Sequence, residues 1–362
     1  MRFFNSLHRK LKIMKTANLT TNQGTANTPD PNTIVVVCAA DNGYAMQVAV
    51  TMHSILDNLS ADRKLLLFII DGGIEDYNKR KIVKGLHPNR CEVRWLPQPD
   101  ALLGDIQVLR DFSIGNITEP KHLTIAAYYR LVIPELIPDE IKKAIYLDCD
   151  LILNTNIGHL WDLDIGENYL LAAQDLTVLT VSAPTGLLNY KELGLSPDAK
   201  YFNSGVLAID VAKWRADNIS AKALKYLREK REYVRWHDQD VLNAVLADRW
   251  GELHPAWNQI PTIYRFQSWQ DSPYTEDVYN ELVYNPYIIH FGGSAKPWNS
   301  REEHPFRHLF FKYVDMTAWS GWRFSIWRRL WRRLNREAKQ LFNFLLPTKK
   351  DSVKNSAQVA AN

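Results

Sequence analysis

Two aspartates flank a single cysteine at the end of an apolar run, in the segment Tyr146-Leu147-Asp148-Cys149-Asp150. Carboxylates inside a buried strand are costly unless they are paired or bound to a cation, and like charges this close repel each other. A divalent cation removes both problems, since hard cations bind carboxylate oxygens and share them with phosphates. Alternate side chains of a strand share a face, so both carboxylates would reach one ion. The pair predicts a metal site for a phosphorylated substrate, with two solvated turn aspartates as the alternative.

Strand and helix patterns alternate along the first half of the chain and predict an α/β fold. The expected elements are strands at 34–40, 65–70 and 91–96 and helices at 47–59 and 74–86. Such βαβ units form a parallel sheet, which binds ligands beyond the carboxyl ends of its strands. Asp41 and Asp71 each follow one of these strands. We therefore expect them to share a crevice with the aspartate pair.

The second half mixes shorter elements and shows no solenoid-type repeat or internal domain boundary. The expected elements are strands at 203–209 and 287–291, helices at 211–228 and 240–248, and an irregular aromatic segment at 255–286. We predict one catalytic domain at 33–315, preceded by a disordered lead-in at 1–32 that is rich in Thr, Asn and Pro. A basic, aromatic tail at 316–362 follows, as an amphipathic helix and a disordered end.

Composition limits the class of protein. The chain has 362 residues, 46% of them apolar, which is enough for a large globular domain. The formal charge of +4 is uneven: residues 321–350 hold nine Lys or Arg and one Glu, a net +8, so the remainder carries −4. This mildly acidic remainder gives no reason to expect nucleic acid as a partner. The three cysteines form no CxxC pair, which favours a reducing compartment.

Six segments, in this order, resemble glycosyltransferase family 8, which includes bacterial lipooligosaccharide galactosyl- and glucosyltransferases and, more distantly, glycogenin. They span about residues 34 to 300 and are Ala39-Ala40-Asp41-Asn42-Gly43-Tyr44, Ala127-Tyr128-Tyr129-Arg130-Leu131, Tyr146-Leu147-Asp148-Cys149-Asp150, Phe202-Asn203-Ser204-Gly205-Val206-Leu207, His237-Asp238-Gln239-Asp240-Val241-Leu242-Asn243 and His290-Phe291-Gly292-Gly293-Ser294-Ala295-Lys296-Pro297-Trp298. The resemblance implies a GT-A-type fold with a mainly parallel central sheet and flanking helices. It also implies a UDP-sugar donor, a Mn²⁺ or Mg²⁺ ion and retention of anomeric configuration.

The resemblance implies that Asp148, Asp150 and His290 are the protein ligands of the metal. Imidazole together with carboxylate oxygens suits Mn²⁺. Lys296 would then lie beside the β-phosphate, where an ammonium stabilises the charge on departing UDP. Gly293 would let the backbone approach the phosphates. On local grounds alone, the histidine could instead be a packed residue and the lysine a surface one.

Further donor-binding residues are implied at two places. The nucleotide would contact Asp41, Asn42 and Tyr44, which follow the first strand, and the backbone of Ala39 at the end of that strand. Cys149 lies between the two metal ligands. Tyr can stack on a base and Asp or Asn can bind its edge, although Asn42 as a helix cap is also consistent with the sequence. The sugar would contact Asn203, Asp238 and Gln239, with Asp175 near the sugar or the acceptor. Arg130 would contact either the sugar or the diphosphate.

Gln239 is expected near the anomeric carbon, on the face opposite the leaving group. It acts there either as a weak nucleophile or as a group that stabilises oxocarbenium character. We favour the second role, because a neutral amide is a poor nucleophile. Asp238, Gln239 and Lys296 are thus the expected catalytic residues.

The basic tail has Trp and Phe residues at helical spacing, with arginines filling most of the remaining positions. A helix with this pattern suits an anionic membrane surface, although a helix packed on the domain or a nucleic-acid arm would look similar. No apolar run is long enough to span a bilayer, and the N-terminus lacks the apolar core of a signal peptide. We therefore expect a cytoplasmic protein, peripheral on the inner face of the plasma membrane.

Together these features predict retaining, metal-dependent transfer of glucose or galactose from UDP-glucose or UDP-galactose to a glycan or lipid-linked acceptor. Two alternatives remain at this point: a self-glucosylating, glycogenin-like primer, and a non-catalytic membrane- or nucleic-acid-binding module with a degenerate site.

Overall fold

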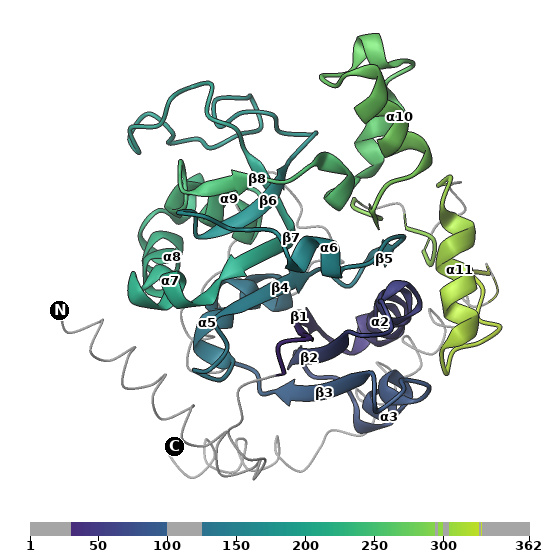
Figure 1. Ribbon diagram of the computed structural model, residues 1–362. Coiled ribbons are helices and arrows are strands. Elements are labelled where there is room, and N and C mark those ends of the chain that lie inside the picture. The colour runs from purple at the N-terminus through teal and green to yellow at the C-terminus, as the bar shows by residue number, and fades with distance from the viewer. Residues whose placement is uncertain (1–29, 100–124, 294–295, 300–303, 326, 328–362) are drawn as a thin grey trace, which may run out of the picture.

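A seven-stranded sheet forms the centre of the protein in the computed structural model, which describes residues 30–99, 125–293, 296–299, 304–325 and 327 (Figure 1). The strand order is β3-β2-β1-β4-β7-β6-β8. The strands are β1 (Thr33–Ala40), β2 (Lys64–Asp71), β3 (Cys91–Leu96), β4 (Lys143–Leu147), β6 (Leu170–Gln174), β7 (Phe202–Asp210) and β8 (Trp250–Glu252). Only β7 among them is reversed, since it pairs antiparallel with both β4 and β6. The expected α/β fold with a mainly parallel sheet is confirmed.

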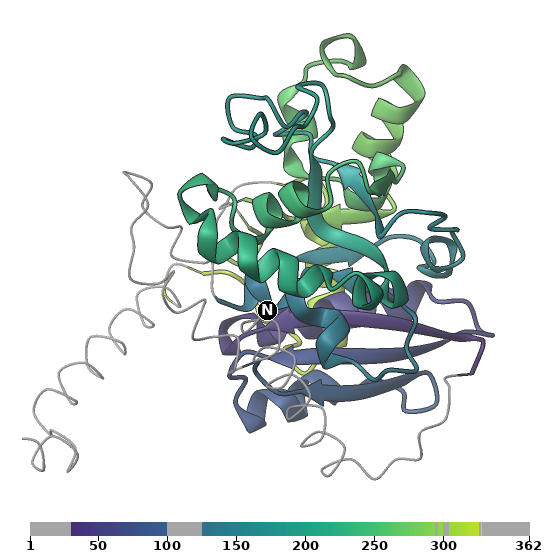
Figure 2. The ribbon, with the colours of Figure 1, turned by 90° about the vertical axis from the view of Figure 1, so that its left-hand side faces the viewer.

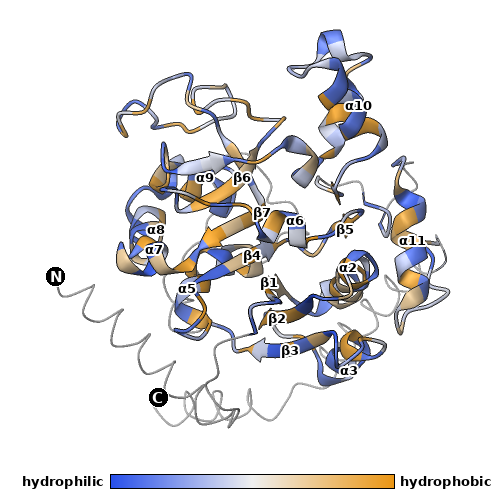
Figure 3. Cartoon of the chain, in the orientation of Figure 1, coloured by the Kyte–Doolittle hydropathy of each residue, from blue (hydrophilic) through white to orange (hydrophobic). Residues whose placement is uncertain are grey.

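Helices cover both faces of the sheet, and Figures 1 and 2 show them on opposite sides. Their bounds are α2 (Ala45–Asn58), α3 (Asp76–Val83), α5 (Ile133–Leu136), α6 (Gly158–Trp161), α7 (Val211–Ala216), α8 (Ile219–Glu229), α9 (His237–Val245), α10 (Glu276–Tyr284) and α11 (Arg307–Met316). Short 3-10 helices include η1 (Asn42–Tyr44), η2 (Ile125–Val132) and η4 (Pro255–Asn258). Apolar residues concentrate in the strands, whereas α8, α10 and α11 carry both apolar and polar sides (Figure 3).

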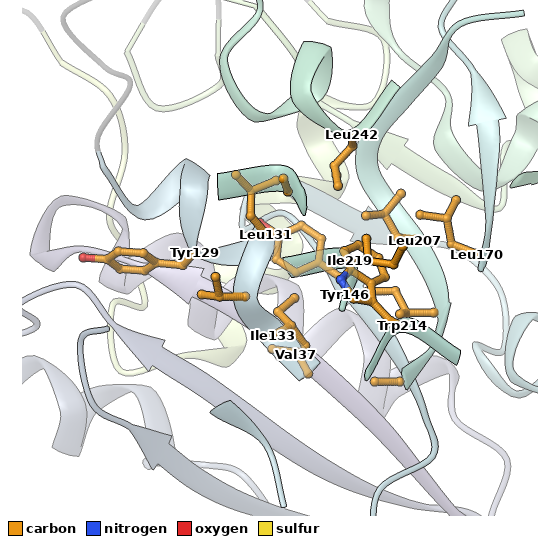
Figure 4. Packing of buried hydrophobic residues seen from close by; sticks show 14 of the residues in the cluster. Val37, Tyr129, Leu131, Ile133, Tyr146, Leu170, Leu207, Trp214, Ile219 and Leu242 are labelled. Atoms are coloured by element: carbon orange, nitrogen blue, oxygen red, sulfur yellow. The ribbon is translucent and has the colours of Figure 1, made fainter. Parts of the chain in front are cut away.

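Alternation along β1 explains the two layers of the core. Val35 and Val37 belong to a cluster with residues of η2, α5, α7, α8 and α9, in which Tyr146 and Trp214 are almost fully buried (Figure 4). Ile34 and Val36 face the other way, into a cluster with residues of α2 and α3. A strand buried on both faces is apolar throughout, which is why the sequence signal for β1 is strong.

A second, two-stranded sheet pairs β5 (Leu151–Leu153) with β9 (Ile288–His290) in antiparallel fashion. This pairing contradicts the continuous strand expected around the aspartate pair. β4 belongs to the large sheet and β5 to the small one, so the chain must turn between them, and Asp148-Cys149-Asp150 forms that turn.

Three other expectations differ from the structure. The helix expected over 211–228 is two helices, because Asn218 adopts a left-handed conformation with φ 52°. The aromatic segment expected to be irregular contains α10. No helix was expected at the position of α11, which packs on α2 through an ion pair of 2.8 Å between Lys312 and Asp57.

Within the described residues, no helix is both long and apolar enough to cross a membrane. The expected lead-in lies almost entirely outside the described residues, and so does most of the basic tail.

Candidate active site

An open cavity of 980 Å³ lies where β1 and β4 end and β7 begins. Of the residues expected at the site, fourteen line it: Ala39, Asp41, Tyr44, Arg130, Asp148, Cys149, Asp150, Asp175, Asn203, Asp238, Gln239, His290, Gly293 and Lys296. They come from segments that together span more than 250 residues of the sequence, from Ala39 to Lys296. The fold therefore gathers the expected site residues around a single space.

Asp148, Asp150 and His290 form a cluster in which one potential ligand atom of each lies within 4.8 Å of the others. His290 Nε2 is 3.8 Å from Asp148 Oδ2 and 3.3 Å from Asp150 Oδ1. β5 and β9 create this proximity, since Leu151 pairs with His290 in their register. Two carboxylate oxygens and an imidazole nitrogen fit a divalent cation such as Mn²⁺. The chemistry and spacing of these donors thus support a metal centre.

Each carboxylate of this cluster has one oxygen bound to a neighbouring side chain. Asp148 Oδ1 accepts hydrogen bonds of 2.8 Å from Tyr146 Oη and from Arg130 Nη2. Asp150 Oδ2 accepts one from Lys296 Nζ, which also donates to the carbonyl of Phe291 at 2.9 Å. Burial alone would raise the pKa of Asp150, but the Lys296 ammonium opposes it, and the pKa lies well below its usual range. The carboxylate is therefore ionised at neutral pH.

Arg130 joins the metal cluster to the residues expected at the sugar. Its Nε lies 2.9 Å from Asp238 Oδ2, and its Nη1 donates to Ser204. Burial would lower the pKa of this guanidinium, but Asp148 and Asp238 outweigh it and raise the pKa. The pKa of Asp238 is itself raised, mainly by burial, with Arg130 opposing that shift. The buried cation compensates two carboxylates that would otherwise repel each other.

Gln239 is held at both ends of its amide. Its Oε1 accepts a hydrogen bond of 3.1 Å from the Ser204 amide, and its Nε2 donates to Asp175 Oδ2 at 3.1 Å. Asn203 donates to the same oxygen at 2.9 Å. The three residues thus form one wall of the cavity, with the orientation of both amides fixed.

The residues after β1 serve different purposes. Asp41 Oδ1 accepts hydrogen bonds from the amides of Gly43 and Tyr44 and caps η1. Asn42 does not line the cavity: its Oδ1 accepts from Glu75 N and Asn78 Nδ2, which ties this loop to the start of α3. Tyr44 lines the cavity and packs edge-on against Trp298. Its pKa is raised, mainly by burial and also by Asp150.

Other residues at the site received no role from the sequence. Tyr146 and Ser204 lie inside the segments that carry the family resemblance, but nothing in their patterns marked them. Asn258, whose Oδ1 is 2.8 Å from His290 Nδ1, lies in the aromatic segment and carried no signal. Trp236, His237 and Tyr264 also line the cavity. These residues are identified as part of the site only by their position in the structure.

Comparison with known proteins agrees with this geometry. The family model described as Glycosyl transferase family 8 matches residues 35–302. General stress protein A of Bacillus subtilis is 36% identical over 288 residues, covering 79% of this chain and 94% of that protein. The lipopolysaccharide 1,3-galactosyltransferase of Salmonella typhimurium is 27% identical over 217 residues, covering 57% of this chain and 59% of that protein.

Solved structures show the same fold. The galactosyltransferase LgtC, solved in complex with donor and acceptor sugar analogs, superposes with a TM-score of 0.65 at 26% identity. That match covers 79% of this chain and 96% of the LgtC chain. The central sheet and flanking helices described above are therefore those of a GT-A glycosyltransferase.

Proposed function

This chain belongs to glycosyl transferase family 8, and on that basis we propose that it transfers glucose or galactose from UDP-glucose or UDP-galactose. The acceptor is a hydroxyl of a glycan or a lipid-linked glycan, and the anomeric configuration is retained. The observation that carries the proposal is the cluster of Asp148, Asp150 and His290 beside Lys296, inside one cavity.

The cluster and Lys296 bind the part of the donor that leaves. Asp148, Asp150 and His290 hold Mn²⁺ or Mg²⁺, which supplies positive charge to the diphosphate when bound. Lys296 is 5% exposed, and its ammonium donates to the carboxylate of Asp150. A fixed cation there stabilises the negative charge that grows on UDP as the sugar–phosphate bond breaks. Gly293, with φ 80°, allows the backbone to turn beside the phosphates.

The remaining residues orient the two ends of the donor. Ala39 lies near the end of β1, and Asp41 and Tyr44 lie just beyond it, where a uridine would bind. Cys149 lines the same cavity. Asn42 acts through the loop, since its side chain binds α3. On the other side, Asn203, Asp238 and Arg130 present polar groups to the sugar hydroxyls.

Gln239 stabilises the developing oxocarbenium ion while the acceptor attacks on the leaving-group face. Its Oε1 accepts a backbone hydrogen bond, and its Nε2 donates to Asp175. Because both ends are engaged, the amide oxygen is a poorer nucleophile than a free amide would be. A covalent sugar adduct trapped on Gln239 would contradict this role.

Release of UDP tests the enzymatic assignment. With Mn²⁺ and no acceptor, the wild-type protein should release UDP from one of the two sugar donors and be inactive after treatment with EDTA. Asp150→Asn should lower the rate by about 100-fold or more, since a lost ligand costs more than a lost supporting contact. A coupled assay for UDP, run on a panel of UDP-sugars, measures both.

The matched control is Asp162→Asn, which removes an exposed carboxylate paired with Arg63 and leaves the cavity unchanged. It should release UDP at the wild-type rate. Equal rates for wild type and Asp150→Asn would contradict the proposed function.

We also propose that the protein is peripheral at the cytoplasmic face of the plasma membrane, where a lipid-linked acceptor is assembled. The support is the arginine-rich sequence of residues 328–339, which lies outside the described residues. Replacing Arg328, Arg329, Arg332 and Arg333 with glutamine should abolish co-sedimentation with anionic vesicles and leave UDP release unchanged. Unchanged sedimentation would exclude this segment as the membrane contact.

A further inference from the structure

A chain of side-chain hydrogen bonds connects the expected metal ligand His290 to Gln239 along the cavity wall. His290 Nδ1 is 2.8 Å from Asn258 Oδ1, and Asn258 Nδ2 donates to Asn203 Oδ1 at 2.8 Å. Asn203 Nδ2 in turn donates to Asp175 Oδ2, which also accepts from Gln239. Asn258 is 5% exposed and does not line the cavity. Its side chain therefore meets the site through two cavity-lining residues, His290 and Asn203.

Two backbone amides of β7 fix the direction of every hydrogen bond in this chain. A backbone N–H can only donate. The Gly205 amide donates to Asn203 Oδ1 at 2.9 Å, so the nitrogen of that side chain must face Asp175. The Ser204 amide does the same for Gln239. The amide orientations at this end are thus set by strand geometry.

The direction of these hydrogen bonds also determines which nitrogen of His290 carries a hydrogen. Asn203 Oδ1 accepts, so Asn258 must present its nitrogen to it and its oxygen to His290. An amide oxygen can only accept, so His290 Nδ1 must carry the hydrogen. The other nitrogen, Nε2, faces Asp148 and Asp150. In the neutral ring its lone pair would be available to a cation bound between these two carboxylates.

We propose that Asn258 is a positioning residue that holds a hydrogen on His290 Nδ1 and thereby keeps Nε2 as the metal-binding nitrogen. The direction of the bonds that reach His290 comes from the Gly205 amide of β7 and passes through Asn203. Partners of this kind orient ligating histidines, and their loss typically weakens metal affinity about 10- to 100-fold. The metal-binding part of this inference rests on the proposed function.

The state of the ring is measurable without metal or sugar. Nitrogen NMR of metal-free protein with ¹⁵N-labelled histidine reports which ring nitrogen carries hydrogen. The His290 resonances are identified by their loss in His290→Gln. A hydrogen-bearing Nδ1 is expected. A hydrogen on Nε2 together with an unprotonated Nδ1 would overturn the proposal.

Metal affinity provides the second measurement. Asn258→Leu, of similar size, should raise the Kd for Mn²⁺, measured by titration calorimetry, by about 10- to 100-fold. The control is Asn189→Leu, an asparagine that is 2% exposed and whose Oδ1 accepts from Tyr226, outside the cavity lining. It should bind Mn²⁺ as the wild type does. An unchanged Kd in Asn258→Leu, or an equal rise in the control, would overturn the proposal.

These outcomes are separable from those of the proposed function. A wild-type protein that holds hydrogen on Nδ1 and binds Mn²⁺ but releases no UDP would contradict only the enzymatic assignment. If Asn258→Leu does not fold, the NMR measurement on the wild type still decides the inference.

Discussion

At the residue scale, the two carboxylates of the metal cluster are oriented before any ligand arrives. Tyr146 and Arg130 occupy one oxygen of Asp148, and Lys296 occupies one oxygen of Asp150. The other oxygen of each faces His290 Nε2. Side chains held in this way lose little freedom when they bind a cation, which is how supporting contacts improve a metal site.

Gly205 lies against this cluster and has no room for a side chain. A Cβ at this position would come within 2.5 Å of His290 Cε1 and within 3.0 Å of Asp148 Oδ2. Gly205→Ala should therefore displace the histidine ring and raise the Kd for Mn²⁺ by about 10-fold or more. Titration calorimetry measures the change.

The midpoint of urea unfolding of the Gly205→Ala protein distinguishes this local effect from a loss of overall stability. The methyl group meets side chains that can shift, so the Gly205→Ala protein should remain folded. A variant that is folded and binds Mn²⁺ with wild-type affinity would show that the cluster tolerates the methyl group.

At the element scale, the sequence predicted the buried strands well and the site geometry less well. β1 and β2 are apolar on both faces, so their patterns were unambiguous. The turn at Asp148-Cys149-Asp150 was hidden, because β4 and β5 together form one apolar run around it. Whether such a run bends depends on its partners, and the partner of β5 is β9, over 130 residues away.

The start of α9 illustrates the same limit. The helix was expected to begin at 240, but it begins at His237, which has φ 54°. Asp240 Oδ2 accepts from the backbone amides of Arg235 and Trp236, which precede the helix. This buried carboxylate places Asp238 and Gln239 in the first turn, facing β7. A carboxylate inside a helix that binds the backbone amides preceding that helix leaves no local pattern in the sequence.

The grouping of Asp148, Asp150 and His290 was predictable only through the family resemblance. Local patterns gave a strand for each segment and no reason to join them. The contact of Asn258 with His290 was not predictable at all, because it depends on how η4 packs beside β9. Sequence patterns therefore predict elements better than the contacts between them.

At the scale of the whole molecule, one histidine links the cavity wall to the stability of the fold. His304 packs edge-on against Tyr264 and Phe291, and its Nδ1 accepts a hydrogen bond of 3.2 Å from the Phe306 amide. Its Nε2 is buried and has no hydrogen-bond partner among the residues that the structure describes. Burial lowers the pKa of His304 to about 4. The folded protein thus favours the neutral ring, whereas the unfolded chain binds a proton near the ordinary pKa of 6.5.

This difference predicts a loss of stability in acid. Between pH 6.5 and 4 the unfolded chain binds more protons, so the free energy of unfolding falls as pH is lowered. The contribution of His304 to the free energy of unfolding is complete above pH 6.5 and amounts to at most about 3 kcal/mol. His304→Gln keeps an acceptor for Phe306 N–H and has no titrating ring, so its free energy of unfolding should change less between pH 7 and 4.5.

The matched control is His308→Gln, which replaces an exposed histidine of α11 and should keep the wild-type dependence on pH. Urea denaturation at both pH values measures the difference, and equal slopes for the wild type and His304→Gln would show that this ring does not set the acid sensitivity.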